Sequence, residues 1–387
     1  MLMHKRGFLN RLLAVLFLVA MVAGQAPVHA QGQTRDPQDL DVFEVRDVAV
    51  DVTAETAAKA REQARAEGEA RAFLRLMERL TLRIEHSGLP QLSAEEISTY
   101  VRDFSVADEK TSSVRYLARL TFHFKPKEVR GLLIESGFSF AETVSKPVLV
   151  LPVFQNAGAL ILWDDPNPWR EAWTVRPKTR SLVPTLLPLG DLADIATIGA
   201  DQAMDGDQQR LAALAKRYGA SDALVVFGVM RIEAAKARRV LDVYFTRFGR
   251  QLKEQTEVMS FPQEKDETVP ALLARAAQEL TYVVEDNWKR DNLLRFDRAG
   301  MIPVVVAISG LKDWIRVRAR LGGVAILRRT EMVLLSKDLV HLNLHFIGET
   351  SQLALALEQA DLKLAQENDQ WRLSLTGPVA SAGPKKK

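Results

Sequence analysis

Residues 147–154 constrain the fold more than any other part of the chain. They read PVLVLPVF, an apolar run without the alternation of polar and apolar residues that a strand with one wet face shows. A short run of this kind, rich in β-branched residues, is typical of a strand buried on both faces of a sheet that helices cover. We therefore predict an α/β layer built around this strand.

Strands and helices alternate around this run between residues 144 and 297, which predicts a central α/β domain with a mostly parallel sheet. Helices on both faces of that sheet explain why no polar residue interrupts the first strand. The further elements expected are a second buried strand over 182–187, a helix over 208–218 stopped by Gly219, strands over 223–230 and 240–247 joined by a charged turn, and a long amphipathic helix over 268–288.

Residues 42–143 are expected to form a smaller α+β domain in the order β-α-β-β-α. Its helix follows a strand over 43–52 and begins after Thr53 or, as a second choice, after Thr56. Small residues recur at helical spacing in its first half and large ones in its second half. The first half can therefore lie close to a sheet. A strand pair over 104–109 and 116–124 and a short helix over 127–135 complete the order.

Residues 298–376 repeat the same order and add a final strand, which gives the β-α-β-β-α-β arrangement of a ferredoxin-like domain. The expected elements are strands over 302–309, 324–335 and 339–347, helices over 312–321 and 351–360, and one or two strands over 362–375. The pentapeptides LTFHF at 120–124 and LNLHF at 342–346 each precede a helix. They indicate an internal duplication, or a chance recurrence of alternating strand residues.

The first thirty residues predict export. Residues 1–30 combine Lys5, Arg6 and Arg11 with an apolar stretch and the small-x-small sequence Val28-His29-Ala30, as a cleaved signal peptide does. We expect a linker over 31–41, a disordered basic tail over 377–387, and a periplasmic protein without stable membrane insertion. Loss of the three leader cations from a net charge of +3 leaves a neutral chain, which excludes an electrostatic case for nucleic acid.

The sequence contains no strong catalytic signature. It has no Gly-x-Ser-x-Gly elbow, no phosphate-binding glycine loop and no His-Glu-x-x-His helix, and the absence of cysteine removes thiol chemistry. His341 and His345 lie on a predicted strand, where four residues span about 13 Å, too far for both imidazoles to bind one ion directly. We therefore predict no enzyme activity, no catalytic residue, no metal ligand and no cofactor.

The segment LWDDPNPWREAW at 162–173 is the most unusual in composition, because it holds three of the six tryptophans. Asn167 followed by Pro168 predicts the start of a helix. The segment is then either the core contact of that helix or an aromatic platform that stacks a sugar ring or buries a partner's apolar side chain. The candidate binding residues are Trp163, Asp164, Asp165, Asn167, Trp169, Arg170 and Trp173.

A second acidic pair, Asp191 and Asp194, follows the predicted strand 182–187 in the sequence PLGDLAD. Ligands of open α/β sheets bind in loops beyond the carboxyl ends of the strands. If the first two central strands are neighbours, Asp164, Asp165, Asp191 and Asp194 converge on one rim. They would there hold a divalent cation, act as acid and base, or simply cap helices and fix loops.

Four stretches carry a family resemblance: residues 43–80, the segment 162–173, and the sequences LVPTLLPLGDLAD and LAALAKRYGASDALVV. Together they resemble the Gram-negative envelope family catalogued as domain of unknown function 2066, which implies no catalytic residues. The central region is also similar to the α/β domain of the TolB amino-terminal region and the curli-secretion lipoproteins. The first domain resembles the amino-terminal domain of the flagellar assembly protein T. Those relatives act by binding other proteins.

These observations favour an exported periplasmic scaffold or adaptor that binds other envelope proteins without catalysis. The alternative is a glycan-binding or hydrolytic envelope protein that uses the tryptophans and aspartates. The sequence leaves the partner, the ligand and the oligomeric state open.

Overall fold

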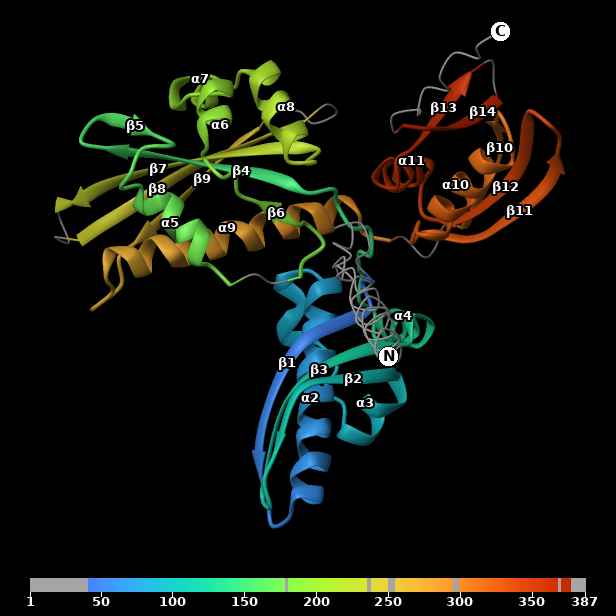
Figure 1. The fold of residues 1–387 in the computed structure, drawn as a ribbon, viewed down its shortest axis with the longest axis horizontal. Helices are drawn as coiled ribbons and strands as arrows, with labels where there is room; N and C mark the ends of the chain where they lie inside the picture. The colour runs from blue at the N-terminus through green and yellow to red at the C-terminus, as the bar shows by residue number, and fades with distance from the viewer. Residues whose placement is uncertain are drawn as a thin grey trace, which may run out of the picture. The chain divides into compact units, whose positions relative to one another are not determined.

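The computed structural model describes residues 41–177, 180–234, 238–249, 255–294, 299–367 and 370–376, and these form a mixed α and β structure with three sheets (Figure 1). The predicted signal peptide, most of the linker and the basic tail lie outside the described residues. Within the described part, no helix has the length and apolarity to cross a membrane. The division into three domains stays a prediction.

The N-terminal sheet has the order β1-β3-β2, formed by Glu44–Thr53, Arg115–Phe124 and Val101–Thr111, with antiparallel pairing throughout. Helix α2 (Ala57–Leu80) packs on β1 and β3 through the predicted small-residue stripe. A Cβ on Gly68 would lie 2.9 Å from the side chain of Leu120, so the helix approaches the sheet closely because this position is glycine. Thr56, the second choice of cap, accepts the hydrogen bond from the Lys59 amide.

Three short helical segments complete this region. A 3-10 turn (Arg83–Gly88) leads to α3 (Ala94–Tyr100). Helix α3 begins with a capping box formed by Ser93 and Glu96. The sequence interpretation missed both. Helix α4 (Pro126–Glu135) was predicted, and Gly137 ends it with a φ of +77°.

The central sheet has the order β5-β4-β7-β8-β9, with β6 (Thr185–Leu186) also paired to β4. Strand β4 (Val148–Asn156) runs parallel to β7 (Asp222–Glu233) and antiparallel to β5 (Ala159–Ile161). Strands β8 (Arg238–Phe248) and β9 (Thr256–Pro262) continue the sheet as antiparallel neighbours. The prediction of a mostly parallel sheet is wrong, because β7 and β8 join through a short connection, which forces them to run antiparallel.

Helices cover both faces of this sheet (Figure 1). Val148, Val150 and Phe154 of β4 face a core shared with α5 (Pro168–Val175) and α9 (Val269–Asp291). The alternate residues Leu149, Leu151 and Val153 face a second core. That core is shared with α7 (Ala200–Met204), with α8 (Gln208–Arg217), and with Ile198, which directly follows α6 (Leu192–Thr197). The continuous apolar run is thus confirmed as a strand buried on both faces. The predicted strand over 182–187 is reduced to two residues.

The C-terminal sheet has the order β11-β12-β10-β14-β13. Its elements are β10 (Ala299–Ala307), α10 (Leu311–Gly322), β11 (Leu327–Leu335), β12 (Leu339–Ile347), α11 (Thr350–Gln359), β13 (Leu362–Glu367) and β14 (Gln370–Leu375). Strand β10 pairs antiparallel with β12 and parallel with β14, and residues 362–375 form two strands. The predicted order of elements is confirmed here.

Candidate functional site

Two of the three tryptophans in the 162–173 segment belong to the core. Trp169 and Trp173 are fully buried on α5, their rings pack edge to face at 5.9 Å, and the Trp169 Nε1 donates a hydrogen bond of 3.0 Å to the Val226 carbonyl on β7. Asn167 caps the helix as predicted, because its side chain accepts from the Arg170 amide at 3.0 Å. These two rings therefore pin α5 to the sheet and do not form part of an exposed platform.

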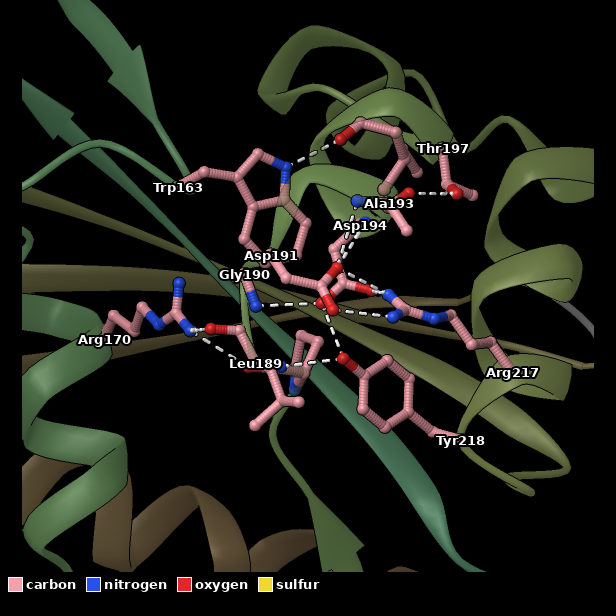
Figure 2. Close-up of polar contacts among 12 residues, drawn as sticks. Trp163, Arg170, Leu189, Gly190, Asp191, Ala193, Asp194, Thr197, Arg217 and Tyr218 are labelled. Atoms are coloured by element: carbon pink, nitrogen blue, oxygen red, sulfur yellow. Dashed lines mark hydrogen bonds and ion pairs between the residues drawn. The ribbon is translucent and has the colours of Figure 1, made fainter.

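Trp163 lies outside that core and is only partly buried. Its Nε1 donates to the carbonyl of Ile198 at 2.7 Å, just beyond α6, and the Arg170 guanidinium lies 5.5 Å from its ring centroid. Arg170 also donates to the carbonyls of Pro188 and Leu189, at 3.0 and 2.6 Å. We call residues 187–191 the β6–α6 loop. Figure 2 shows Trp163 and Arg170 on the same side of this loop. Arg170 holds the loop from the α5 side through the Pro188 and Leu189 carbonyls, whereas Trp163 contacts Ile198 beyond α6.

The second acidic pair holds the same loop from the other side. Asp191 caps α6 by accepting from the amides of Ala193 and Asp194 at 3.0 Å, and it accepts from Arg217 Nη2 at 2.6 Å. Asp194 is fully buried, and its side chain contacts the Arg217 guanidinium. Its carboxylate accepts from the Gly190 amide at 2.8 Å, from the Tyr218 hydroxyl at 2.6 Å and from Arg217 Nη1 (Figure 2).

The geometry of Gly190 shows how tightly this loop is enclosed. Its φ is +76°, in the left-handed region that favours glycine, and a Cβ there would overlap with the Arg170 guanidinium. Tyr218 links the two ends of the arrangement, since its hydroxyl donates to Asp194 and accepts from the Leu189 amide at 2.8 Å. The main chain of the loop is therefore fixed at Pro188, Leu189 and Gly190 by named side chains.

The electrostatics of this cluster favour charged, paired groups. The hydrogen bond from Arg217 holds the pKa of the Asp191 carboxyl well below its usual range, and the same contact raises the pKa of Arg217. Burial, and then the hydrogen bond to Asp194, raise the pKa of the Tyr218 hydroxyl, so the tyrosine keeps its proton as a donor. A carboxylate held this way is poorly suited to exchange protons with a substrate.

The four aspartates do not meet as the sequence suggested. Asp164 and Asp165 are exposed, and no described contact joins them to Asp191 or Asp194. Nor do the described residues contain a group of three or more histidine or acidic side chains placed to hold a metal ion. The structure therefore places Asp191 and Asp194 in the capping and loop-fixing role, which was the simpler of the two interpretations.

Sequence reasoning missed the apolar side chains that are exposed on this loop and on the helix that follows it, α6. Leu189 is 74% exposed, and Leu192 and Ile195, one turn apart on α6, are 85% and 48% exposed. We call these three residues the Leu189–Ile195 patch. The signal was present in the sequence PLGDLADI, where apolar residues alternate with aspartates at a helix start. Only the aspartates of this stretch were predicted as candidate site residues, and its apolar residues were not considered.

Comparisons with family models, with curated proteins and with solved structures found no match for this chain. The family resemblance noted in the sequence therefore stays a prediction.

Proposed function

We propose that this chain is an exported periplasmic protein that works as a non-enzymatic scaffold or adaptor and binds another envelope protein through the Leu189–Ile195 patch. The observation that carries the proposal is the exposure of three large apolar side chains, Leu189 on the β6–α6 loop and Leu192 and Ile195 on α6, next to a loop backbone that other side chains hold in place. Clustered exposed apolar residues are typical of sites that bind proteins.

The rigidity of the β6–α6 loop strengthens this proposal. Binding requires that interface segments lose conformational freedom, and a segment already held in its bound shape loses less. Arg170 fixes the carbonyls of Pro188 and Leu189, and Asp194 fixes the Gly190 amide. Leu189 and Leu192 are therefore presented from a backbone that does not have to be ordered by the partner.

The surroundings of the patch suggest the chemistry of the partner. Asp164, Asp165 and Glu171, from the neighbouring tryptophan segment, are exposed. A partner surface with an apolar centre and basic residues at its rim would match this arrangement, because charges at the rim of an interface guide association. Trp163 and Arg170 of this segment contact Ile198 and Leu189, and we therefore propose that its exposed acidic residues form the rim of the interface.

The proposed compartment and architecture come from the sequence. The signal peptide of residues 1–30, the similarity of the central region to the TolB amino-terminal domain, and the ferredoxin-like order of the C-terminal region all support an envelope protein that acts by binding. The competing interpretation, glycan binding or hydrolysis, would use tryptophans of which two are in the core and an Asp194 that three donors already occupy. We do not propose it.

In-cell photocrosslinking tests the proposal. A crosslinkable residue replaces Leu189, Leu192, Asp165 or Glu171 in turn, and Ile232 serves as the matched control because it is also 74% exposed and lies on the same sheet. We expect one discrete protein adduct from these four positions and none from Ile232, with the partner identified by mass spectrometry. The same yield at Ile232, or no adduct at Leu189 or Leu192 in folded protein, would refute a docking role for the Leu189–Ile195 patch.

A further inference from the structure

The outer strand of the N-terminal sheet, β2, has one free edge. It pairs with β3 alone among the described strands, and nearly all of its residues are exposed. Phe104 and Val106 lie opposite Phe122 and Leu120 of β3, whose side chains lie beneath α2. The side chains of Phe104 and Val106 therefore point to the same face as α2, yet they are 43% and 36% exposed.

A groove runs along this face between α2 and β2. The side chains of Ala58, Arg61, Glu62 and Arg65, which form one stripe of α2, make its wall, and Phe104, Tyr116 and Leu120 make its floor around a cavity of about 340 Å³. Helix α3 packs against α2 and against β2. Figure 1 shows α3 beside only one end of β2. The sheet is thus left with an apolar strip beside an unpaired edge.

Two irregularities delimit the usable part of this edge. The register between β2 and β3 shifts between Val101 and Asp103 and again between Ala107 and Lys110, and Asp108 has a φ of +53°. Bulges of this kind normally prevent another strand from pairing with an edge. Here they leave a regular segment from Asp103 to Ala107, which has Ser105 at its centre.

The symmetry of this segment matches that of a two-fold dimer. Consider two copies of one strand that pair antiparallel about a two-fold axis perpendicular to the sheet. Opposed residues must point to the same face, and neighbouring residues of one strand point to opposite faces. The axis must therefore lie between one residue and the same residue of the second copy, and cannot fall between two neighbouring positions. An axis at Ser105 places Phe104 opposite Val106 of the second copy, twice. An axis at Val106 would instead oppose Phe104 to Asp108, and an axis at Phe104 would oppose the bulged Arg102 to Val106.

The charges at the ends of the segment agree with the same register. With an axis at Ser105, Arg102 and Asp108 of the second copy lie just beyond each end of the regular ladder, in the bulged positions. Both side chains are more than half exposed, and their partners within the chain, Asp103 and Arg119, are exposed as well. These opposite charges favour this register at the ends of the ladder, whereas an axis at Val106 would bring Arg102 toward Lys110.

The other exposed edge, β11, lacks this symmetry. It exposes Met332, Val333, Leu334 and Leu335, which makes it more apolar than β2. Its bulges fall between Leu327 and Arg329 and between Met332 and Leu334, so its longest regular stretch has an even number of residues. No residue lies at the centre of that stretch, so a two-fold axis there would sit off-centre, at Thr330 or Glu331, and would align only three regular residues instead of the five of β2.

We propose that the free edge of β2 binds the same strand of a second copy of this chain, antiparallel and centred on Ser105, so that two three-stranded sheets become one continuous sheet. Phe104 and Val106 of the two copies then cover each other on the α2 face. This inference is independent of the proposed function, since it uses a different sheet and a different surface.

A single engineered cysteine tests the register, because the natural chain contains none. In the proposed dimer Ser105 faces its own counterpart, and opposed residues of antiparallel strands have Cα atoms about 4.5–5.5 Å apart, within the range of a disulfide. We expect purified S105C protein to form a covalent dimer under mild oxidation. Circular dichroism of the reduced protein confirms that the variant is folded.

The matched control is A107C, on the same strand and the same face. In the proposed register the two Ala107 residues are offset by four positions, about 13 Å, so no disulfide can form between them. We expect A107C alone to oxidise to dimer roughly tenfold more slowly than S105C, since only random collisions bring its thiols together. An equimolar mixture of A107C and D103C should form the mixed dimer readily, because these two positions oppose each other.

Light scattering on the protein without cysteine supplies the second test. The wild-type mass should rise toward that of two chains as concentration increases, and V106K should shift this transition to higher concentration. Equal oxidation rates for S105C and A107C, or a wild-type mass of one chain at the highest soluble concentration, would overturn the proposal.

Discussion

Leu192 and Asp194 lie two residues apart on α6, and their environments are the reverse of what their chemistry suggests. The aspartate is fully buried, whereas the leucine is among the most exposed apolar residues of the described chain. Asp194 tolerates burial because Arg217, Tyr218 and the Gly190 amide satisfy its carboxylate. Among the residues that the structure describes, no side chain covers Leu192 in this way, and it is 85% exposed. The region therefore has two sides. On the sealed side, buried residues such as Asp194 hold the β6–α6 loop in place; on the open side, Leu189, Leu192 and Ile195 are exposed to solvent.

The largest expected effect belongs to the sealed side. Trp169→Ala removes a fully buried ring and its hydrogen bond to Val226, and we expect it to lower the free energy of unfolding by about 3–5 kcal/mol. Urea unfolding followed by circular dichroism measures the change. Trp163→Ala is the control within the same segment, and it should cost clearly less because that ring is only partly buried.

The buried carboxylate gives the next effect. Asp194→Asn keeps the size of the side chain but removes the charge that Arg217 and Tyr218 contact, so we expect a loss of about 1–3 kcal/mol. Asp164→Asn, on the exposed side, should change stability by less than about 0.5 kcal/mol. Urea unfolding of both variants measures the contrast, and similar losses would show that the division into two sides is wrong.

A smaller effect should appear as a pH dependence. The pKa of Asp191 is depressed in the folded chain, chiefly by Arg217, so its contribution to stability is present above the unfolded-state pKa and is lost as pH falls toward the folded value. Asp191→Asn keeps the helix cap, because asparagine caps well, and removes only the charge. The melting temperatures of the two proteins, measured from pH 6 to about pH 2, should therefore converge as the solution becomes acidic. A constant difference would contradict this account.

The smallest effect on stability belongs to the open side. Leu192→Lys replaces an exposed residue, so its free energy of unfolding should stay within about 0.5 kcal/mol of the wild-type value. The same change should abolish the photocrosslinked adduct at Asp165, because a charge would occupy the centre of the proposed interface. Loss of the adduct with loss of folding would instead indicate that Leu192 supports the loop.

Local sequence patterns predicted a helix or strand correctly where the residues of that segment alone determine its structure. The run of residues 147–154 is confirmed as β4, and the Asn167-Pro168 start of α5 is confirmed with its cap. The prediction failed where distant segments decide. The burial of Asp194 cannot be read locally, because Arg217 and Tyr218, which satisfy its carboxylate, come from a later part of the chain. The antiparallel direction of β8 follows from its short connection to β7, whereas the edge strands β5 and β9 were not predicted.

The first and last sheets share the placement of one strand. The pentapeptides LTFHF and LNLHF lie on β3 and β12, and each of these strands sits between the first and second strands of its own region. The shared placement supports the hypothesis of an internal duplication, which stays a prediction. The last region adds β14 beside its first strand, whereas the chain after α4 continues into the central sheet.

The parallel ladder between β4 and β7 has a consequence for the time course of folding. The hairpins β2–β3 and β7–β8 join segments that are close in the sequence, whereas β4 must wait for β7, which follows it only after six intervening elements. The chain loses the conformational entropy of this long loop before the two strands gain any contact, which slows folding. The β4–β7 ladder should therefore form late within the central sheet. Trp169, which hydrogen-bonds to β7, offers an intrinsic fluorescent reporter of that step.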